Sequence, residues 1–319
     1  MLMPIKWMAD EALASFYHGK SVLVTGANGF VAHYLIPRLA KLGSAVYGVD
    51  LQKHSRIQGY GYHSCDLLDF SRIKQVIEQC RPDFVFHLAS KSSVGSSWTH
   101  AWETIECNTK STYHLFKALD DDHHAVILLL TSSGEVYGSI GNRKALESDN
   151  LNPMNPYAVS KASMEMIAHS FGDNNINYII ARSYNHTGPG RLETFFESSV
   201  AKRFADAKMA GKNNVILRVG NISNIRDYSD VRDVVEKYLL LLCQAGNRNI
   251  YNVCSGTGMM LKDIIALLEQ ITGITAHIDV EESKLRKNDI PYFVGANSIE
   301  IESTPICKTI RDLFESFLK

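Results

Sequence analysis

Short hydrophobic runs rich in β-branched and aromatic residues alternate with longer amphipathic segments along the first 184 residues. The runs have the length and composition of buried strands, and they cover residues 21–25, 45–50, 62–65, 83–88, 125–131 and 178–182. The amphipathic segments predict a short lead-in helix before Gly19, a helix that ends near Leu42, and helices over 71–80, 100–119 and 156–171. Strands and helices that alternate in this way pack as a parallel sheet with helices on both faces, so the pattern predicts a doubly wound α/β fold.

The regular alternation of predicted strands and helices ends after Arg182. Helices are predicted near 197–209, 231–245, 261–272 and 306–317, but the strands at 215–218 and 249–253 are short and spaced irregularly. We therefore expect residues 1–184 to form a dinucleotide-binding domain. Residues 185–319 are expected to form a smaller C-terminal α/β substrate lobe, with part of the chain returning to the sheet.

A glycine-rich turn follows the first predicted strand and leads directly into a helix. Gly26 suits a tight turn, and Gly29 lets the backbone approach a pyrophosphate held at the helix N-terminus. Ala32 stands where a third glycine is common and affects only helix–strand packing. Strand, turn and helix together predict a Rossmann-type domain that binds a nicotinamide dinucleotide.

The second predicted strand ends at Asp50, where the ribose hydroxyls of NAD would lie. A carboxylate at this position repels a 2′-phosphate, so NAD(H) is favoured over NADP(H). The basic residues Lys53 and Arg56 follow closely and could accommodate that phosphate, so NADP(H) stays open. Asp66 and Leu67, after the third strand, are placed to meet the adenine edge.

Tyr157 and Lys161 are four residues apart and so lie on one face of a helix. Asn155 is a good N-cap and Pro156 fits the first helical position, so this helix should begin at the tyrosine. A nearby ammonium favours the phenolate, and we expect it to lower the pKa of Tyr157 and make it a general acid or base. Ser133 lies at the carboxyl end of a predicted parallel strand, where ligands bind in doubly wound sheets.

The composition excludes several classes of binding partner for the protein. The 319 residues are 45% hydrophobic and 21% charged with a net charge of −1, so no overall field attracts nucleic acid or an anionic membrane. The apolar runs are too short to span a bilayer. Six scattered cysteines without Cys-x-x-Cys spacing predict reduced thiols and a cytoplasmic protein. The histidines show no metal-ligand spacing, and we expect no metal.

These motifs together resemble the extended short-chain dehydrogenase/reductases that act on nucleotide-diphosphate sugars. The motifs that carry the resemblance are residues 25–31, 87–89, Asn108, Ser133 with Tyr137 and Gly138, Tyr157 with Lys161, Asn185 with Gly188 and Pro189, and residues 226–231. Within the family, segments such as 183–190 and 251–256 are most similar to GDP-4-keto-6-deoxy-D-mannose reductases, which form GDP-D-rhamnose.

The resemblance implies a role for each matching residue. Ser133 would hydrogen-bond the C4 carbonyl of the sugar, Tyr157 would donate the proton, and Lys161 would bind the nicotinamide ribose. Asn185, Arg226 and Arg286 would hold a nucleotide-diphosphate sugar, preferably GDP-linked, and the two arginines would clamp its diphosphate. Ser93 is a further expected substrate contact. The other expected cofactor contacts are Asn28, Phe30, Val31, Leu88, Ala89, Lys91 and Tyr184. The family often dimerises through the helices that begin near His100 and Pro156, so a homodimer is expected.

Other functions remain open at this point. Glu135 stands where 4,6-dehydratases carry their base, whereas Gly134 replaces the acid of nucleoside-diphosphoglucose dehydratases. A 4-epimerase uses the same Ser–Tyr–Lys set, and a dinucleotide-sensing regulator could keep the fold without catalysis. Arg191 and residues 192–197 are unusual for a substrate loop. Residues 302–305 replace the Gly-Trp-x-Pro segment of the family.

Overall fold

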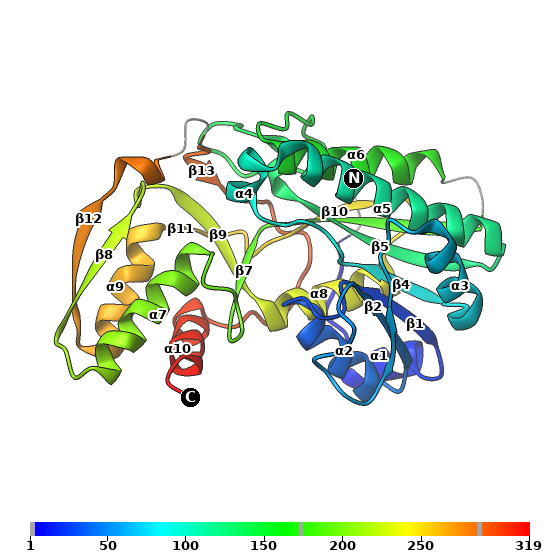
Figure 1. The fold of residues 1–319 in the computed structure, drawn as a ribbon, viewed down its shortest axis with the longest axis horizontal. Coiled ribbons are helices and arrows are strands. Elements are labelled where there is room, and N and C mark those ends of the chain that lie inside the picture. The colour runs from blue at the N-terminus through cyan, green and yellow to red at the C-terminus, as the bar shows by residue number, and fades with distance from the viewer. Residues whose placement is uncertain (1–3, 172–174, 286–288) are drawn as a thin grey trace.

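The computed structural model describes residues 4–171, 175–285 and 289–319, and its centre is a seven-stranded sheet (Figure 1). The strand order is β10-β6-β5-β4-β1-β2-β3, and every neighbouring pair is parallel. The strands are β1 (Ser21–Thr25), β2 (Ala45–Asp50), β3 (Gly61–Ser64), β4 (Phe84–His87), β5 (Val126–Ser133), β6 (Ile176–Ser183) and β10 (Ile250–Val253). The predicted doubly wound sheet is confirmed, with small shifts at the strand ends.

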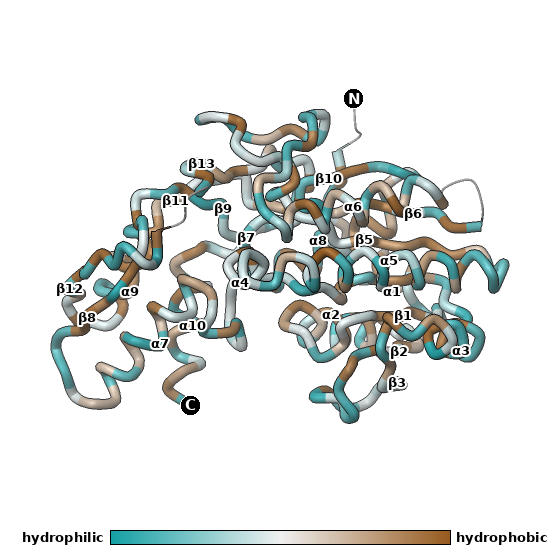
Figure 2. Tube along the Cα trace, turned by 45° about the horizontal axis from the view of Figure 1, so that its top comes forward, coloured by the Kyte–Doolittle hydropathy of each residue, from teal (hydrophilic) through white to brown (hydrophobic). Residues whose placement is uncertain are grey.

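Helices cover both faces of this sheet and bury one hydrophobic cluster on each. One face carries α1 (Asp10–Tyr17), α2 (Ala32–Lys41) and α8 (Val231–Gln244). The other carries α3 (Phe70–Cys80), α5 (Ala101–Asp122) and α6 (Pro156–Ser170). Hydrophobic and hydrophilic residues alternate along α5 in Figure 2, as expected for a helix with one buried face.

The strand order reverses between β1 and β4, because the chain builds outward from β1 first through β2 and then through β4. In such sheets ligands bind in the crevice beyond the carboxyl ends of the strands at the reversal point. The fold therefore places the ends of β1, β4 and β5 around one prospective site.

Most of the chain after residue 184 packs around a core of its own. Three helices, α7 (Phe196–Met209), α9 (Leu261–Thr272) and α10 (Ile306–Ser316), share a buried cluster that includes Phe204, Leu217 and Leu268. Strand β8 (Asn214–Val219) pairs with β12 (Thr275–Val280). In contrast, α8 and β10 pack with the main sheet, although both follow residue 185. The exact division at residues 184 and 185 stays a prediction.

Several short elements were not predicted from the hydrophobic pattern. They are α4 (Val94–Thr99), β7 (Asn185–Thr187), β9 (Ile225–Asp230), β11 (Gly258–Met260), β13 (Tyr292–Phe293), strand β12 and the 3₁₀ turns at Gly134–Tyr137 and Glu282–Lys284. Strand β9 shows the reason. It buries the carboxylate of Asp227, which accepts hydrogen bonds from the amides of Ser255 (2.7 Å) and Gly256 (2.9 Å). Tertiary hydrogen bonds make a polar strand possible here, and hydropathy cannot indicate them.

The segment before α10, which departs from the family pattern, is attached to α8. Asp233 accepts hydrogen bonds from the amide (2.7 Å) and the hydroxyl (2.8 Å) of Thr304.

Within the described ranges, no helix combines the length and the apolar character that crossing a membrane requires.

Candidate active site

A cavity of about 670 Å³ lies at the carboxyl ends of the central strands, between the main sheet and the elements that follow β6. It is the place that the strand reversal indicates. Nearly all described residues that the sequence nominated line its wall. They are Gly26, Gly29, Phe30, Val31, Asp50, Asp66, Leu67, Leu88, Ala89, Lys91, Ser93, Ser133, Glu135, Tyr157, Lys161, Tyr184, Asn185 and Arg226. Asn28 does not line the cavity, and Arg286 lies outside the described residues.

The turn between β1 and α2 has the geometry of a phosphate cradle. Gly26 has φ +69°, and a Cβ atom placed on it would lie 2.9 Å from the amide nitrogen of Ala89. Any side chain at this position would collide with the backbone after β4. The amide of Ala89 in turn donates to the hydroxyl of Thr25 (3.2 Å). A pyrophosphate can therefore approach backbone here, at the N-terminus of α2.

Asp50 lines the cavity at the end of β2, and Asn28 is hydrogen-bonded to it. The carboxylate of Asp50 accepts hydrogen bonds from the amides of Asn28 (3.1 Å) and Gln52 (3.3 Å). The side chain of Asn28 turns to the following loop, where it donates to the carbonyl of His54 (3.1 Å) and accepts from the amide of Arg56 (2.7 Å). Asn28 thus holds the loop that flanks Asp50, and a contact with the dinucleotide stays a prediction.

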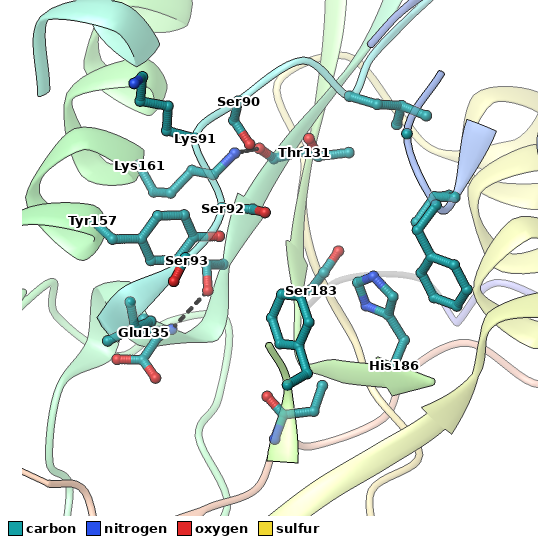
Figure 3. Close-up of a pocket in the computed structure, with 18 of the residues that line it drawn as sticks. Ser90, Lys91, Ser92, Ser93, Thr131, Glu135, Tyr157, Lys161, Ser183 and His186 are labelled. Carbon is teal, nitrogen blue, oxygen red and sulfur yellow. Dashed lines mark hydrogen bonds between the residues drawn. The ribbon is translucent and has the colours of Figure 1, made fainter. Parts of the chain in front are cut away.

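Helix α6 presents Tyr157 and Lys161 to the cavity, as the sequence predicted. Asn155 caps the helix by accepting a hydrogen bond from the amide of Ala158 (2.8 Å), and Pro156 occupies the first turn. Lys161 is 2% exposed, and its Nζ donates to the carbonyl of Thr131 (2.8 Å). Both side chains project from α6 toward the loop that contains Ser92 (Figure 3). The Nζ atom lies 5.8 Å from the centre of the Tyr157 ring.

Ser133 and Glu135 lie at the end of β5, beside Tyr157. The hydroxyl of Ser133 accepts a hydrogen bond from the amide of Glu135 (3.2 Å), which fixes the position of the hydroxyl. The Glu135 carboxylate accepts a hydrogen bond from the side chain of Asn155 (2.8 Å). The N-cap of α6 is therefore connected to the acidic residue of the site.

Burial changes the acid–base properties of the pair on α6. It raises the pKa of Tyr157 far above the ordinary value of a phenol, and the hydrogen bond with Ser133 offsets only part of this effect. Burial also lowers the pKa of Lys161 to about 7, although the charge of Glu165 raises it. The expectation that Lys161 would lower the pKa of Tyr157 is therefore wrong for this structure, because the phenolate loses its hydration. Tyr157 is protonated at neutral pH, as a proton donor must be.

Several side chains of the expected substrate region already have protein partners. The guanidinium of Arg226 bonds to the carboxylate of Asp289 (2.8 Å) and the carbonyl of Ile290 (2.7 Å). Lys91 forms an ion pair with Glu103, and the Ser93 hydroxyl caps α4 by accepting from the amide of Ser96 (3.2 Å). A diphosphate clamp built from Arg226 would have to compete with Asp289, so this role stays a prediction.

A cluster of four residues in the cavity wall was not predicted. The Phe30 ring stacks on His186, with centroids 6.1 Å apart and planes inclined by 4°. The Arg191 guanidinium lies over the rings of Phe195 (3.4 Å) and Phe30 (5.1 Å). The cluster joins the glycine turn to the loop after β7. Arg191 was noticed in the sequence only as unusual, because residue spacing does not reveal that two distant loops meet.

Among the residues that the structure describes, no group of three or more His, Cys, Asp and Glu side chains is arranged to hold a metal ion.

The chain is similar to known nucleotide-sugar proteins. Residues 23–304 match the family described as GDP-mannose 4,6 dehydratase. The chain is 31% identical over 269 residues to a GDP-6-deoxy-D-mannose reductase of Pseudomonas aeruginosa, covering 83% of this chain and 84% of the relative. It is 26% identical over 276 residues to a GDP-6-deoxy-D-talose 4-dehydrogenase of Aggregatibacter actinomycetemcomitans, covering 86% and 87%. A solved structure of RMD from Pseudomonas aeruginosa complexed with NADPH has a TM-score of 0.81 and 28% identity, covering 94% of this chain and 99% of that one.

Proposed function

The chain belongs to the GDP-mannose 4,6 dehydratase family, and from this membership and the chemistry of its cavity we propose that it is a nicotinamide-dependent reductase of nucleotide sugars. The observation that carries the proposal is the meeting of Tyr157, Ser133 and Lys161 in one cavity with the glycine turn. A ketone can be reduced where a proton donor, a hydrogen bond to the carbonyl oxygen and a hydride source converge.

The substrate we propose is GDP-4-keto-6-deoxy-D-mannose, reduced at C4 to GDP-D-rhamnose. The relative with 31% identity is named as a GDP-6-deoxy-D-mannose reductase, and the relative with 26% identity as a 4-dehydrogenase of another GDP-linked 6-deoxy sugar. Both names refer to 6-deoxyhexoses linked to GDP. Asn185 and Arg226, which line the cavity, are the residues that we expect to contact this substrate.

The proposed reaction adds one hydride and one proton across the C4 carbonyl. A bound NADH or NADPH supplies the hydride. Ser133 donates a hydrogen bond to the carbonyl oxygen, and Tyr157 gives its phenolic proton to that oxygen as negative charge develops. Lys161 is the residue that we expect to bind the nicotinamide ribose. The raised pKa of Tyr157 supports this direction, because the residue enters the reaction protonated.

A 4,6-dehydratase is the second candidate, because Glu135 lines the cavity next to Ser133. One feature argues against the kind of dehydratase that uses an acid at position 134. A Cβ atom on Gly134 would lie 2.6 Å from the ring of Tyr184, so the ring occupies the space of a side chain. Dehydratases that rely on the glutamate alone are not affected by this contact, and the assay below separates them.

For the cofactor, NAD(H) is our proposed preference. The Asp50 carboxylate lies in the cavity wall at the end of β2, where it would repel a 2′-phosphate. NADPH is bound in the solved structure of RMD, so the two cofactors must be compared directly.

A homodimer through α5 and α6 is the assembly we propose. These neighbouring helices expose large apolar side chains, including Trp102 (72% exposed), Tyr113 and Met166. An apolar face of this kind is typical of a protein interface.

All six cysteines are free thiols, which supports a cytoplasmic location.

The decisive experiment offers the purified protein two substrates. With GDP-4-keto-6-deoxy-D-mannose and NADH or NADPH, a reductase oxidises the cofactor and forms a GDP-6-deoxyhexose. With GDP-mannose and oxidised cofactor, a dehydratase forms a 4-keto product that absorbs in alkali. If the protein forms the keto product in the second assay but oxidises no cofactor in the first, the proposal of a reductase is contradicted. Cofactor binding without turnover of either substrate would indicate a dinucleotide sensor.

A further inference from the structure

We propose that Glu165 is a positioning residue for this site, which keeps the Lys161 ammonium charged and fixes the end of β5 against α6. The inference rests on the proposed function only for the roles of Lys161 and Ser133. Glu165 does not line the cavity, and it would act through the residues that it holds.

Glu165 is buried one helical turn beyond Lys161, on the same helix. It is 1% exposed, and its carboxylate accepts hydrogen bonds from Nε (3.0 Å) and Nη2 (2.7 Å) of Arg182. Arg182 is 3% exposed and lies on β6. The two charges therefore form a bidentate pair that the surrounding protein shields from water.

The same carboxylate also holds the strand that carries the reacting hydroxyl. The hydroxyl of Ser132 donates to Oε1 of Glu165, and Ser132 pairs with Arg182 in the sheet register. On one side of Ser132, the carbonyl of Thr131 accepts the hydrogen bond from Lys161 (2.8 Å). On the other side, Ser133 lines the cavity. Glu165 thus fixes the middle of three consecutive residues, and the outer two serve the site.

The charged groups around Lys161 show why the Glu165 carboxylate affects the protonation of this lysine. Burial lowers the pKa of Lys161 to about 7, and Glu165 raises it. From β4, His87 faces the lysine, but its own pKa is lowered to about 3, so it is neutral. Tyr157, on the same helix, is protonated at neutral pH. The charge of Arg182 is matched by Glu165 itself. Glu165 is therefore the group that we expect to stabilise the ammonium.

Structural support alone does not require charged residues at these positions. A buried ion pair can often be replaced by apolar residues of similar volume with little loss of stability, whereas removing one partner is strongly destabilising. An apolar pair could fill the space between α6 and β6, but it could not stabilise a neighbouring ammonium. This difference makes the proposal testable.

The test measures cofactor affinity as a function of pH, without sugar, in the paired variant E165M/R182M and in the isosteric variant E165Q. The affinity of the parent protein should fall as rising pH removes the proton of Lys161. Without the carboxylate the lysine loses its proton more easily, so the midpoint should move to lower pH by about one unit. The matched control is R38M/E236M, which replaces another Arg–Glu pair (2.7 Å), joining α2 to α8. Its midpoint should equal that of the parent.

A folded E165M/R182M or E165Q protein with the parent midpoint would overturn the proposal, because Glu165 would then be only structural. Failure of both variants to fold would also reject it, in favour of a purely structural pair. If the parent protein reduces no nucleotide sugar but the midpoint shifts, the proposed reaction fails and the role of Glu165 stands. The cofactor measurement keeps the two questions separate.

Discussion

The phenolic oxygen of Tyr157 is the atom on which the proposed chemistry depends. We expect Tyr157→Phe to lower kcat by about 10²–10⁴-fold, because the forming alkoxide loses its proton donor. Cofactor affinity should change little, since Lys161 keeps its own hydrogen bond to Thr131. Steady-state kinetics and fluorescence titration with reduced cofactor measure the two quantities. Turnover close to that of the parent would remove Tyr157 from proton transfer.

The carboxylate of Asp50 is expected to select the cofactor. Asp50→Ala should weaken NADH binding and leave NADPH binding unchanged or stronger, because the ribose hydroxyls lose an acceptor and a 2′-phosphate loses a repelling charge. Dissociation constants for both cofactors, measured for parent and variant, test this directly. If both cofactors weakened equally, Asp50 would serve only to hold the amides of Asn28 and Gln52.

Helix α6 is the element that aligns the site, and its first residues connect it to β5. Asn155 caps the helix and donates to Glu135, so Asn155→Ala removes both hydrogen bonds. We expect a loss of about 1 kcal/mol in the free energy of unfolding, together with a lower kcat because Tyr157 lies in the first turn of this helix. Urea unfolding and kinetics measure these effects.

A matched control for that variant is Asp69→Ala. Asp69 caps α3 by accepting from the amide of Arg72 (3.2 Å), and it does not line the cavity. It should lose a similar amount of stability and keep the parent kcat. Equal kinetic losses in the two variants would show that the kinetic effect reflects general destabilisation rather than the position of α6.

For the whole molecule, buried titratable groups make stability depend on pH. His87 is fully buried between the hydroxyls of Thr25 (2.8 Å) and Thr112 (3.1 Å). Burial lowers its pKa from 6.5 to about 3. Between these values the unfolded chain binds a proton that the folded protein does not, so stability falls as the pH is lowered through this range.

We therefore expect the free energy of unfolding to decrease between pH 6.5 and pH 4, and His87→Gln to reduce this dependence. Glutamine keeps a donor and an acceptor but does not titrate. Urea unfolding at several pH values provides the measurement. An unchanged slope in the variant would mean that other groups, not His87, account for the acid sensitivity.

Much of this protein follows from local sequence signals. Alternating strands and helices predicted the sheet, Asn155 and Pro156 predicted the start of α6, and Gly26 predicted the tight turn between β1 and α2. The resemblance to nucleotide-sugar enzymes is confirmed by the family match. These features depend on residues close together in the chain, where hydrophobic periodicity, capping and backbone freedom act.

The rest depends on contacts between distant segments. The tertiary structure decided that burial raises the pKa of Tyr157, that Asn28 turns toward its own loop, and that Asp289 pairs with Arg226. It also brought Arg191 over Phe30 and Glu165 beneath Lys161. Hydration and charge are set by which groups meet in space. The sequence by itself therefore determined the architecture and predicted which side chains react, whereas the tertiary structure alone decided the burial and the partners of those side chains.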